Sequence, residues 1–572
     1  MFKLFKEMDL KFVALGIVLS AIRVAGMVAL PTLTANIIDY GVMEGDMAYI
    51  FQQGFLMMAI TVICIFFAVG AAYINSTQSQ GLGEKLRNRA FIKILNFSNE
   101  DLDDFGTSSL ITRTTNDVMQ LQFVMLHFLM MLGLDPFLIL GSATAAFIRE
   151  PQLAVVFFIT APLLGIAIFF IIRAASPLFR KLQLQTDVIN RIFREGLTGV
   201  RVVRAFNKTE YEENRFNEAN EEFKSISVHA FFRLALFMPV MILVMSLTNI
   251  LIVWFGTRLV GSGQMLVGNM VAFLTYAGLL MTGIMLLAQV LSFMPRGQIA
   301  AERIMAVLNH KSSINDDEHP EPISDEPVEL TFDHVNFRYP GAEKLALANI
   351  DFEVKAGETL AVIGGTGTGK TSLANLMLRL YDVESGEIRL NGINIQHLSQ
   401  YDLREKIGFA PQTPVLFSGT IRENLSYGRT DATDEEIWAA LKVAQGAEFV
   451  RGLEAGLDSR VEHGGGNFSG GQRQRLSIAR ALVTDAEILI FDDSFSALDF
   501  KTDANLRAAL KPVTEDKAVV IIAQRISTVV DADQILVLDN GELVGKGTHE
   551  ELKQSNKIYQ EIMNSQMKGD EL

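Results

Sequence analysis

Apolar and polar positions divide the chain into two contrasting halves. Roughly the first 300 residues contain long apolar runs rich in Met and Phe, whereas the remainder alternates short apolar stretches with glycine and charged residues. The first pattern is typical of membrane helices and the second of a globular domain. We therefore expect a transmembrane domain at 1–308, a polar, Pro-bearing linker at 309–328 and a soluble domain at 329–572.

Six segments approach or exceed the roughly 20 apolar residues that cross a bilayer. They lie at 12–36, 54–75, 124–148, 152–173, 231–256 and 266–293. The long connections 76–123 and 174–230 are rich in Lys and Arg, whereas the short connections are not. The positive-inside bias therefore predicts that the long connections, the N-terminus and the soluble domain are cytoplasmic.

The long connections also look helical, so the spans should continue beyond the bilayer as extended helices. Two polar turns within them, at 99–109 and 206–216, are candidates for contact with the soluble domain. The alternative is that both turns are solvated loop tips.

Two ionisable residues stand within the predicted spans, where a charge is costly. Arg23 either has a function or simply reaches the inner interface with its long side chain. Asp135 directly precedes Pro136, so it either lines a cargo pathway or caps a helix broken by the proline. The single cysteine, Cys64, reads as a small buried hydrophobe, and one chain can form no disulfide.

Charge narrows the choice of partners. A net charge of −15 argues against nucleic acid, because phosphate binding needs a basic face. At the N-terminus, Lys3, Lys6 and Lys11 precede an apolar run that is too long for a signal peptide, so we expect a retained span.

A phosphate-binding loop follows the linker. In LAVIGGTGTGKTSLANLML, an apolar strand ending at Ile363 leads into Gly364, four further residues, Gly369, Lys370 and Thr371, and then a helix-period pattern. The glycines let backbone N–H groups close on phosphates, Lys370 reaches the β and γ oxygens, and Thr371 offers its hydroxyl to Mg²⁺. The sequence therefore predicts a nucleotide site at this loop.

Two more stretches extend that chemistry. The apolar run Ile488–Phe491 is typical of a strand covered on both faces, and Asp492 at its end can hold Mg²⁺ beside the phosphate loop. Just before it, Ser469, Gly470 and Gly471 open a helix whose N–H groups can receive phosphate. Because the phosphate loop already serves one nucleotide, this second turn should serve a nucleotide held by another domain.

Together these stretches resemble ATP-binding cassette (ABC) transporters, specifically half-transporters of the exporter type with six spans and one cassette. The resemblance covers essentially the whole chain. It implies an α-helical membrane domain of the type IV exporter kind followed by an α/β P-loop nucleotide-binding domain, with ATP and Mg²⁺ as cofactors. It also implies that two cassettes pair head to tail, so that each ATP lies between one chain's Walker motifs and the other chain's signature. By position, the two inner-loop turns match the family's coupling helices.

The family's site residues fall on matching positions of this sequence. The resemblance assigns nucleotide binding to Tyr339, to Gly364, Thr366, Gly367, Gly369, Lys370, Thr371 and Ser372 of Walker A, and to Ser469, Gly470, Gly471 and Gln472 of the signature. It assigns magnesium to Thr371, Gln412 and Asp492, and hydrolysis to Gln412 and to the positions of Asp493 and Gln524. Ser496–Asp499 matches the D-loop.

Two of these positions depart from the family. The general base is normally Glu and the switch residue is normally His, but here they are Asp493 and Gln524. Asp is shorter by one methylene, and a displacement near 1 Å can cost on the order of 100-fold in rate. Gln524 can donate a hydrogen bond but cannot become cationic. The signature stays whole, although Phe468 replaces the usual Leu before it.

The sequence therefore predicts one half of a heterodimeric exporter in the plasma (inner) membrane, in contact with membrane lipid. Its own Walker site would bind ATP but hydrolyse it poorly. Its signature would complete the site of a second, homologous half-transporter that has the catalytic Glu, the switch His and a degenerate signature. Small amphipathic drugs are the first choice of cargo, with lipids or peptides as alternatives. The rival hypotheses are a homodimer in which Asp493 is a sufficient base, and a nucleotide-gated channel or regulatory subunit.

Overall fold

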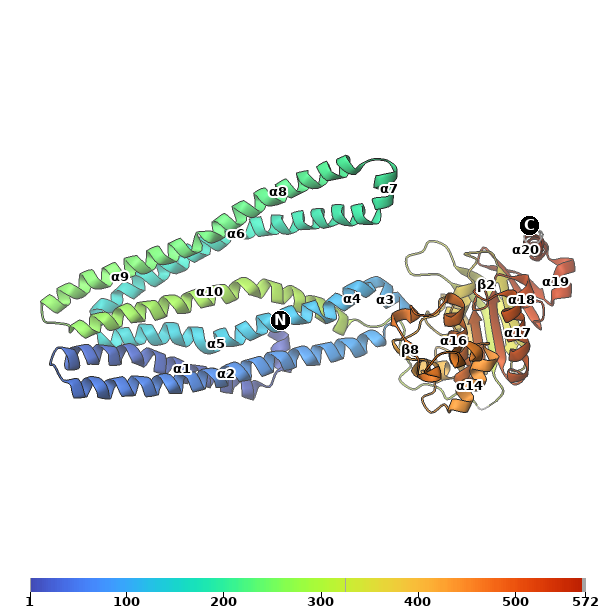
Figure 1. Cartoon of the computed structure of the whole chain (residues 1–572), viewed down its shortest axis with the longest axis horizontal. Helices are drawn as coiled ribbons and strands as arrows, with labels where there is room; N and C mark the ends of the chain where they lie inside the picture. Colours follow the sequence, from blue (N-terminus) through green and yellow to red (C-terminus); the bar gives the residue numbers. More distant parts are fainter. Residues whose placement is uncertain (1, 325, 568–572) are drawn as a thin grey trace. The chain divides into compact units, whose positions relative to one another are not determined.

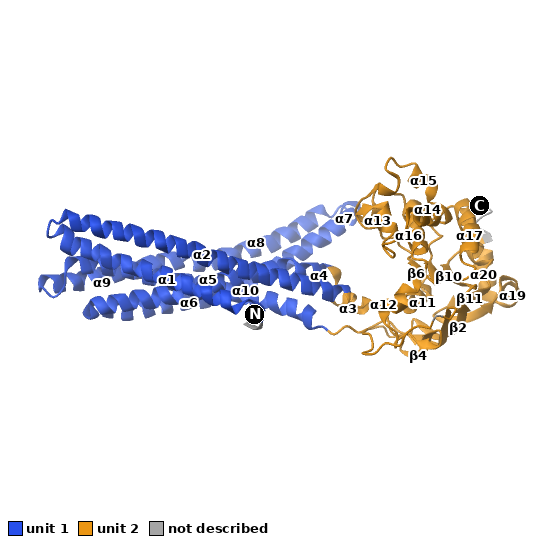
Figure 2. Cartoon of the chain, turned by 90° about the horizontal axis from the view of Figure 1, so that it is seen from below, with its two compact units in different colours: residues 1–95, 108–310 blue, residues 96–107, 311–572 orange. Residues whose placement is uncertain are grey.

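The computed structural model describes residues 2–324 and 326–567, which form two compact units (Figure 2). Unit 1 comprises Met1–Leu95 and Ser108–His310, and unit 2 comprises Asn96–Thr107 and Lys311–Leu572. Most of the chain thus divides between a membrane half and a soluble half. The exception is the short segment 96–107, which packs with the soluble half although it lies in the first long inner connection.

Unit 1 is a bundle of long helices (Figure 1). Its elements are η1 (Phe2–Glu7), α1 (Leu10–Asn36), the π-helical turn η2 (Ile37–Val42), α2 (Met47–Leu95), α4 (Thr107–Thr114), α5 (Asn116–Arg149), α6 (Pro151–Thr198), α7 (Val200–Ala205), α8 (Thr209–Ala235), α9 (Phe237–Gly261) and α10 (Val267–Asn309).

Six helical stretches of the described chain are long and apolar enough to cross a membrane. They are Leu10–Val42, Met47–Leu95, Thr107–Arg149, Pro151–Thr198, Thr209–Gly261 and Val267–Asn309. Each predicted span lies within one of these stretches, except that the last begins one residue before Val267, so the prediction of six spans is confirmed. The helices also run far past the apolar segments, and Figure 1 shows α6 and α8 diverging together from the other helices toward α7. The predicted helical character of the inner connections is therefore confirmed as well.

The intramembrane ionisable residues have distinct surroundings. Helix α5 runs unbroken through Pro136, so the hypothesis that Asp135 caps a broken helix is wrong. Inside a membrane bundle, neighbouring helices and Ser or Thr side chains can satisfy the backbone groups that a proline leaves without a helical hydrogen bond. Asp135 is buried, and one of its carboxylate oxygens has no hydrogen-bond partner among the described residues. Cys64 is half-buried rather than buried, with its Sγ 3.4 Å from the carbonyl oxygen of Arg23.

Unit 2 is built on a ten-stranded sheet in the order β5-β4-β1-β2-β12-β11-β3-β10-β9-β6. The strands of this sheet are β1 (Glu329–Phe337), β2 (Leu347–Lys355), β3 (Thr359–Gly364), β4 (Ser385–Leu390), β5 (Ile393–Asn394), β6 (Ile407–Ala410), β9 (Ile488–Asp492), β10 (Ala518–Ala523), β11 (Gln534–Asp539) and β12 (Glu542–Gly547). A separate two-stranded sheet joins β7 (Gly419–Thr420) to β8 (Arg460–Val461).

Helices surround this sheet and carry most of the connections. They are α3 (Asn99–Phe105), α11 (Lys370–Met377), α12 (Gln400–Glu405), α13 (Ile421–Leu425), α14 (Asp434–Val443), α15 (Ala447–Arg451), η3 (Gly456–Asp458), η4 (His463–Gly465), α16 (Gly470–Val483), α17 (Phe500–Leu510), η5 (Lys511–Val513), α18 (Ile526–Val529), α19 (His549–Ser555) and α20 (Lys557–Met567).

The central strands are buried on both faces. In β9, Leu489 and Phe491 belong to one apolar core, and Ile488 and Ile490 belong to the core on the other face. This confirms the interpretation of the apolar run as a doubly covered strand. β9, β10 and β3 are neighbouring parallel strands, so their carboxyl ends bring Asp492 and the loop after Gly364 to the same edge of the sheet. That edge is where ligands bind in open α/β sheets.

Candidate functional site

The predicted phosphate loop joins β3 to α11 through a backbone that requires glycine. Gly369 precedes the helix at φ +96°, and a Cβ there would lie 2.7 Å from the carbonyl oxygen of Ala346. The buried ammonium of Lys370 donates to the carbonyl oxygens of Gly364 and Gly365, at 3.0 and 2.6 Å. Burial lowers the pKa of Lys370, and the charges of Asp493 and Asp492 oppose that shift. The loop therefore holds a cation at the start of a helix, which suits a phosphate chain.

This loop forms one wall of a pocket of about 520 Å³. Predicted site residues account for most of the lining: Tyr339, Thr366, Gly367, Gly369, Lys370, Thr371, Ser372, Gln412, Asp492, Asp493 and Gln524. Gly364 meets the pocket only indirectly, through its hydrogen bond from Lys370. The signature residues 469–472 are not in the lining, so one chain brings together the Walker residues, Gln412 and the switch residue Gln524 but not the signature.

Sequence reasoning missed part of the lining, namely Leu345, Ala346, Ile522, Asn540 and Gly541. The last two form the turn between β11 and β12, where both residues have positive φ (48° and 84°). Asn-Gly between two strands is the strongest short signal of such a hairpin turn. That signal would have predicted the turn, but only the sheet order shows that the turn reaches the nucleotide loop.

The first carboxylate of the pair faces the hydroxyl expected to hold metal. Thr371 donates its hydroxyl to Asp492 at 3.4 Å, from the first turn of α11 to the end of β9. Burial raises the pKa of Asp492, the hydrogen bond from Thr371 lowers it, and the charge of Asp493 raises it further. A hydroxyl and a carboxylate beside a phosphate loop are the oxygen ligands that Mg²⁺ accepts, so this donor set fits the ion.

The second carboxylate is held by two amides. Gln524 donates to Oδ2 of Asp493 at 2.9 Å, and Gln412 donates to the same oxygen at 3.2 Å. Asp493 has a left-handed backbone (φ +47°) that is fixed by its N–H, which donates to the carbonyl oxygen of Ile522 at 2.8 Å. Burial raises the pKa of Asp493, while the hydrogen bond from Gln412 opposes the shift. The three hydrolysis positions therefore converge on one oxygen.

Tyr339, the aromatic residue expected to stack on adenine, lies beside the phosphate loop. The hydroxyls of Tyr339 and Ser372 are 2.8 Å apart, and the ring of Tyr339 meets that of Tyr381 edge-on at 5.3 Å. This places Tyr339 against the first turn of α11. Because Tyr339 also lines the pocket, an aromatic ring is available there for a nucleotide base.

The signature opens α16 as a capping box. Ser469 accepts from the N–H of Gln472 at 3.3 Å, and Gln472 accepts from the N–H of Ser469 at 2.9 Å. These side chains therefore have a structural role in one chain, which is to start the helix. Next to them, a Cβ added at Gly470 would meet no atom within 4 Å, so the helix start is open on that side.

A bundle of membrane-crossing helices joined to an α/β domain with a phosphate loop defines a membrane transporter that carries its own ATP-binding domain. Residues 13–285 match the ABC transporter transmembrane region, and residues 347–496 match the ABC transporter family. The chain is 38% identical over 560 residues to an uncharacterized ABC transporter ATP-binding protein of Mycobacterium tuberculosis, covering 97% of this chain and 96% of that protein.

Other relatives have more specific names. One, a "Probable multidrug resistance ABC transporter ATP-binding/permease protein" of Bacillus subtilis, is 32% identical, covering 97% of this chain and 95% of that protein. Another, an "ATP-dependent lipid A-core flippase" of Desulfotalea psychrophila, is also 32% identical, with 93% of each chain covered. The structure is similar to that of a bacterial Atm1-family ABC exporter with ATP bound, with a TM-score of 0.80 and 25% identity over 97% of this chain and 99% of that chain.

The chain therefore belongs to the ABC transporters. It has the exporter fold, with six apolar helices followed by an α/β nucleotide-binding domain, and it is a multi-pass membrane protein that couples ATP to export. The predicted fold class is confirmed. The ATP-binding domain implies ATP as a cofactor, normally with Mg²⁺.

Proposed function

We propose that this chain is one half of a heterodimeric exporter whose two ATP sites are unequal. The observation that carries the proposal is the cluster at Asp493, where a shortened carboxylate is held by the amides of Gln412 and Gln524. ABC exporters normally have Glu and His at the positions of Asp493 and Gln524. In this chain's own Walker site, the two groups that act on water are therefore both altered.

ATP binding does not depend on the altered residues. Lys370 and the loop glycines would hold the phosphates, Thr371 and Asp492 would hold Mg²⁺ with Gln412, and Tyr339 would stack on adenine; all of these side chains line the pocket. The ion, when bound, would supply charge neutralisation at the phosphates. We therefore expect this site to hold ATP with ordinary affinity and to hydrolyse it slowly.

The intact signature supports a role in the opposite site. Ser469–Gln472 lie outside the chain's own pocket, and the open side of Gly470 leaves room for a phosphate chain brought by another cassette. A second half-transporter with the catalytic Glu and switch His would use this surface. Its own signature would be the degenerate one, because it serves the slow site.

Amphipathic drugs are the cargo that we propose first, with lipids and peptides as alternatives. Two relatives named for multidrug resistance and for lipid A flipping fit hydrophobic or amphipathic cargo. The basic inner connections support a plasma (inner) membrane location with the nucleotide-binding domain in the cytoplasm.

Purification of the natural complex tests this proposal. A tag on this chain should retrieve a second ABC half-transporter in equal amount, and Glu→Gln at the partner's general base should nearly abolish ATP turnover. A complex of this chain alone that hydrolyses ATP at ordinary transporter rates would overturn the proposal. In that case Asp493 would be the base of a homodimer.

A further inference from the structure

The short helix α3, in the first inner connection, has a buried carboxylate in its first turn. This carboxylate, Asp101, accepts hydrogen bonds both from the start of the helix and from the linker. Ser98 and Asp101 form the capping box that starts the helix: Asp101 N–H donates to Ser98 Oγ at 3.1 Å, and Ser98 N–H donates to Asp101 Oδ2 at 2.9 Å. The same Oδ2 accepts the hydroxyl of Ser312 at 2.5 Å. Asp101 is only 2% exposed and Ser312 is 7% exposed, so this carboxylate is shielded from water.

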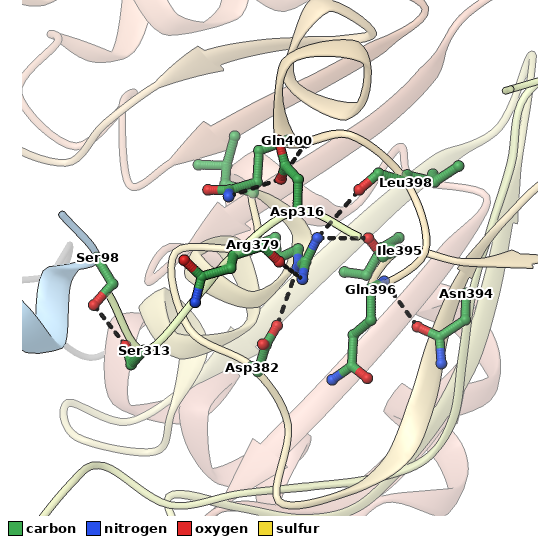
Figure 3. Close-up of polar contacts among 12 residues, drawn as sticks. Ser98, Ser313, Asp316, Arg379, Asp382, Asn394, Ile395, Gln396, Leu398 and Gln400 are labelled. Atoms are coloured by element: carbon green, nitrogen blue, oxygen red, sulfur yellow. Dashed lines mark hydrogen bonds and ion pairs between the residues drawn. The ribbon is translucent and has the colours of Figure 1, made fainter. Parts of the chain in front are cut away.

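A second polar contact lies beside the first. The hydroxyls of Ser98 and Ser313 are 2.7 Å apart (Figure 3), and the N–H of Ser313 donates to Asp101 Oδ1 at 3.4 Å. Ser312 and Ser313 stand at the start of the linker, more than 200 positions away in sequence. The helix is thus bound by the linker, and we call this set of contacts (Ser98, Asp101, Ser312, Ser313) the clamp.

From the clamp, hydrogen bonds continue to the end of α11. Asn315 donates to the carbonyl oxygen of Ser312 at 2.7 Å, and its own carbonyl oxygen accepts from Arg379 at 3.1 Å. Figure 3 shows the guanidinium of Arg379 among several acceptors: it donates to the carbonyl oxygens of Ile395 and Leu398 and pairs with Asp382. Arg379 is 3% exposed and lies two positions beyond Met377, the last residue of α11.

Helix α11 begins with the phosphate-binding residues, so its two ends face two different partners. The first turn holds Lys370 and Thr371 in the pocket, and the other end is fixed by Arg379 to the linker and by the linker to α3. Arg404 fixes the same end by donating to the carbonyl oxygens of Leu378 and Arg379, at 3.1 and 3.0 Å. A displacement of α11 on nucleotide binding would therefore move the linker and α3 with it.

The membrane helices α4 and α10 lie next to the clamp in sequence: α4 follows α3, and α10 precedes Ser312. After α3 the chain enters α4 within two residues, and Arg113 of α4 donates to the carbonyl oxygen of Arg303 in α10 at 3.0 Å. Arg303 pairs with Asp117 of α5 at 3.2 Å. Helix α10 ends at Asn309, three positions before Ser312. A motion of α3 would therefore reach α4 and α5 along the chain, and α10 is joined to the clamp by the short stretch between Asn309 and Ser312.

We propose that Asp101 and Ser312 are positioning residues that couple the nucleotide pocket to the membrane helices through the linker. With the clamp closed, α11, the linker and α3 move as one body. With the clamp broken, ATP still binds at Lys370, but the start of α5 no longer responds. The inference requires only the ATP-driven cycle of the family and not the unequal pair of sites proposed above.

Hydrogen–deuterium exchange on the full transporter tests the clamp. In the wild type, MgATP should protect the segment 364–372 and change exchange in the segment 107–123. Asp101→Asn should keep the first response and lose most of the second, and any fluorescent dye transport should fall about tenfold at an ATPase rate within twofold of the wild type. Asp104→Asn is the matched control, because Asp104 is exposed on the same helix.

A covalent clamp separates coupling from simple loss of structure. Ser98→Cys with Ser313→Cys, in a Cys64→Ala background, would close the clamp by oxidation. In the Asp101→Asn chain, oxidation should restore the response at 107–123 and reduction should remove it, while Ser312→Thr should preserve it by keeping the hydroxyl. An unaltered response in Asp101→Asn, or no recovery after confirmed cross-linking, would overturn the clamp. A wild type in which MgATP leaves 364–372 unprotected would instead contradict ATP binding at the proposed site.

Discussion

At the scale of single residues, the environment of Asp493 explains why the hydrolysis positions must be treated as a group. Its Oδ2 accepts from both Gln524 and Gln412, and its backbone is held in the left-handed region by the hydrogen bond to Ile522. Asp is among the few residues that readily adopt this conformation. A longer carboxylate at this position would have to reach further into the pocket while keeping the same backbone.

Repair of this group should raise hydrolysis at the weak site. In a complex whose partner lacks its own catalytic Glu, Asp493→Glu with Gln524→His should increase ATP turnover by about 10- to 100-fold, because the carboxylate regains about 1 Å of reach and the switch regains an imidazole. Single-turnover ATP hydrolysis measures this. Asp493→Asn with Gln524→His is the control and should gain nothing. If the repaired site stays as slow as the control, the defect lies elsewhere.

Buried Asp493 should also make the nucleotide-free protein sensitive to pH. Burial raises its folded-state pKa above the unfolded value, so the stability linked to its protonation is fully present below the unfolded pKa and is lost as pH rises through the folded pKa. Asp493→Asn removes the free-energy cost of burying an ionised carboxylate. Its unfolding midpoint should exceed that of the wild type at pH 7, and the difference should shrink toward pH 4.

Asp499 provides a control of opposite sign for this measurement. It accepts from the N–H of Thr502 at the start of α17, and that backbone hydrogen bond holds the pKa of its carboxyl below the usual range. Its contribution is present above the unfolded pKa and is lost as pH falls through the folded pKa. Asp499→Asn should therefore lower the midpoint at pH 7 and have less effect toward pH 4. If the unfolding midpoints of both variants shifted by the same amount at every pH, the opposite pKa shifts of Asp493 and Asp499 would be contradicted.

Local motifs predicted most of the pocket residues, because the residue types in a phosphate loop indicate their chemical roles. Lys370, Thr371 and Asp492 could be assigned from a loop and a strand end alone. The clamp could not be predicted, because Ser98 and Ser312 are ordinary polar residues whose meaning depends on a contact across more than 200 positions. Arg379 was missed for the same reason, since its acceptors are backbone carbonyls that no side-chain pattern marks.

At the scale of elements, the period of the apolar residues was sufficient for the helices and the central strands. It located one apolar span in each of the six long helical stretches, although not the ends of those stretches. It also identified β9 as doubly covered, because burial on two faces removes the alternation of an exposed strand. The polar turn at 99–109 was predicted as a contact with the soluble domain, and the grouping of α3 with unit 2 confirms that prediction. The residues of the linker that bind α3 did not follow, since a seven-residue polar helix has too few apolar positions to indicate them.

Close packing between α5 and α10 leads to a prediction about stability. A Cβ at Gly297 would lie 2.7 and 2.9 Å from Cγ1 and Cβ of Val124, which is a stiff, β-branched side chain. Gly297→Ala should therefore separate the helices and lower stability by about 1–3 kcal/mol, as overpacking does. Thermal unfolding of the purified protein in detergent measures the effect.

Gly278 is the matched control on the same helix. A Cβ there would meet only the terminal methyl of Met245, at 3.8 Å, which is ordinary contact. Gly278→Ala should leave the midpoint unchanged or raise it, because alanine is favoured over glycine in a helix by up to about 1 kcal/mol. Equal losses in both variants would mean that the two helices are not closely packed at Gly297.

At the scale of the whole molecule, the soluble unit has two nucleotide-facing surfaces, the pocket around Asp493 and the signature at the start of α16. In a heterodimer with unequal ATP sites, we expect damage to these two surfaces to affect ATP turnover differently. The pocket around Asp493 would contribute little to turnover, whereas the signature at the start of α16 would serve the active site of the partner. A homodimer has no such asymmetry, because each chain would then supply both surfaces to every working site. Damage to the pocket and damage to the signature should therefore differ only in a heterodimer.

Gly470 allows that difference to be measured without unfolding the chain. A side chain added there meets no atom within 4 Å, and a carboxylate at the first position of α16 is favourable to the helix. Gly470→Glu should therefore leave the unfolding midpoint intact but repel the γ-phosphate of the partner's ATP, lowering steady-state hydrolysis by the natural complex at least about 100-fold. Gly470→Ala should retain most of the activity, and Asp493→Asn should lower it less than threefold. If Asp493→Asn is as damaging as Gly470→Glu, the two sites are equal and the chain works as a homodimer.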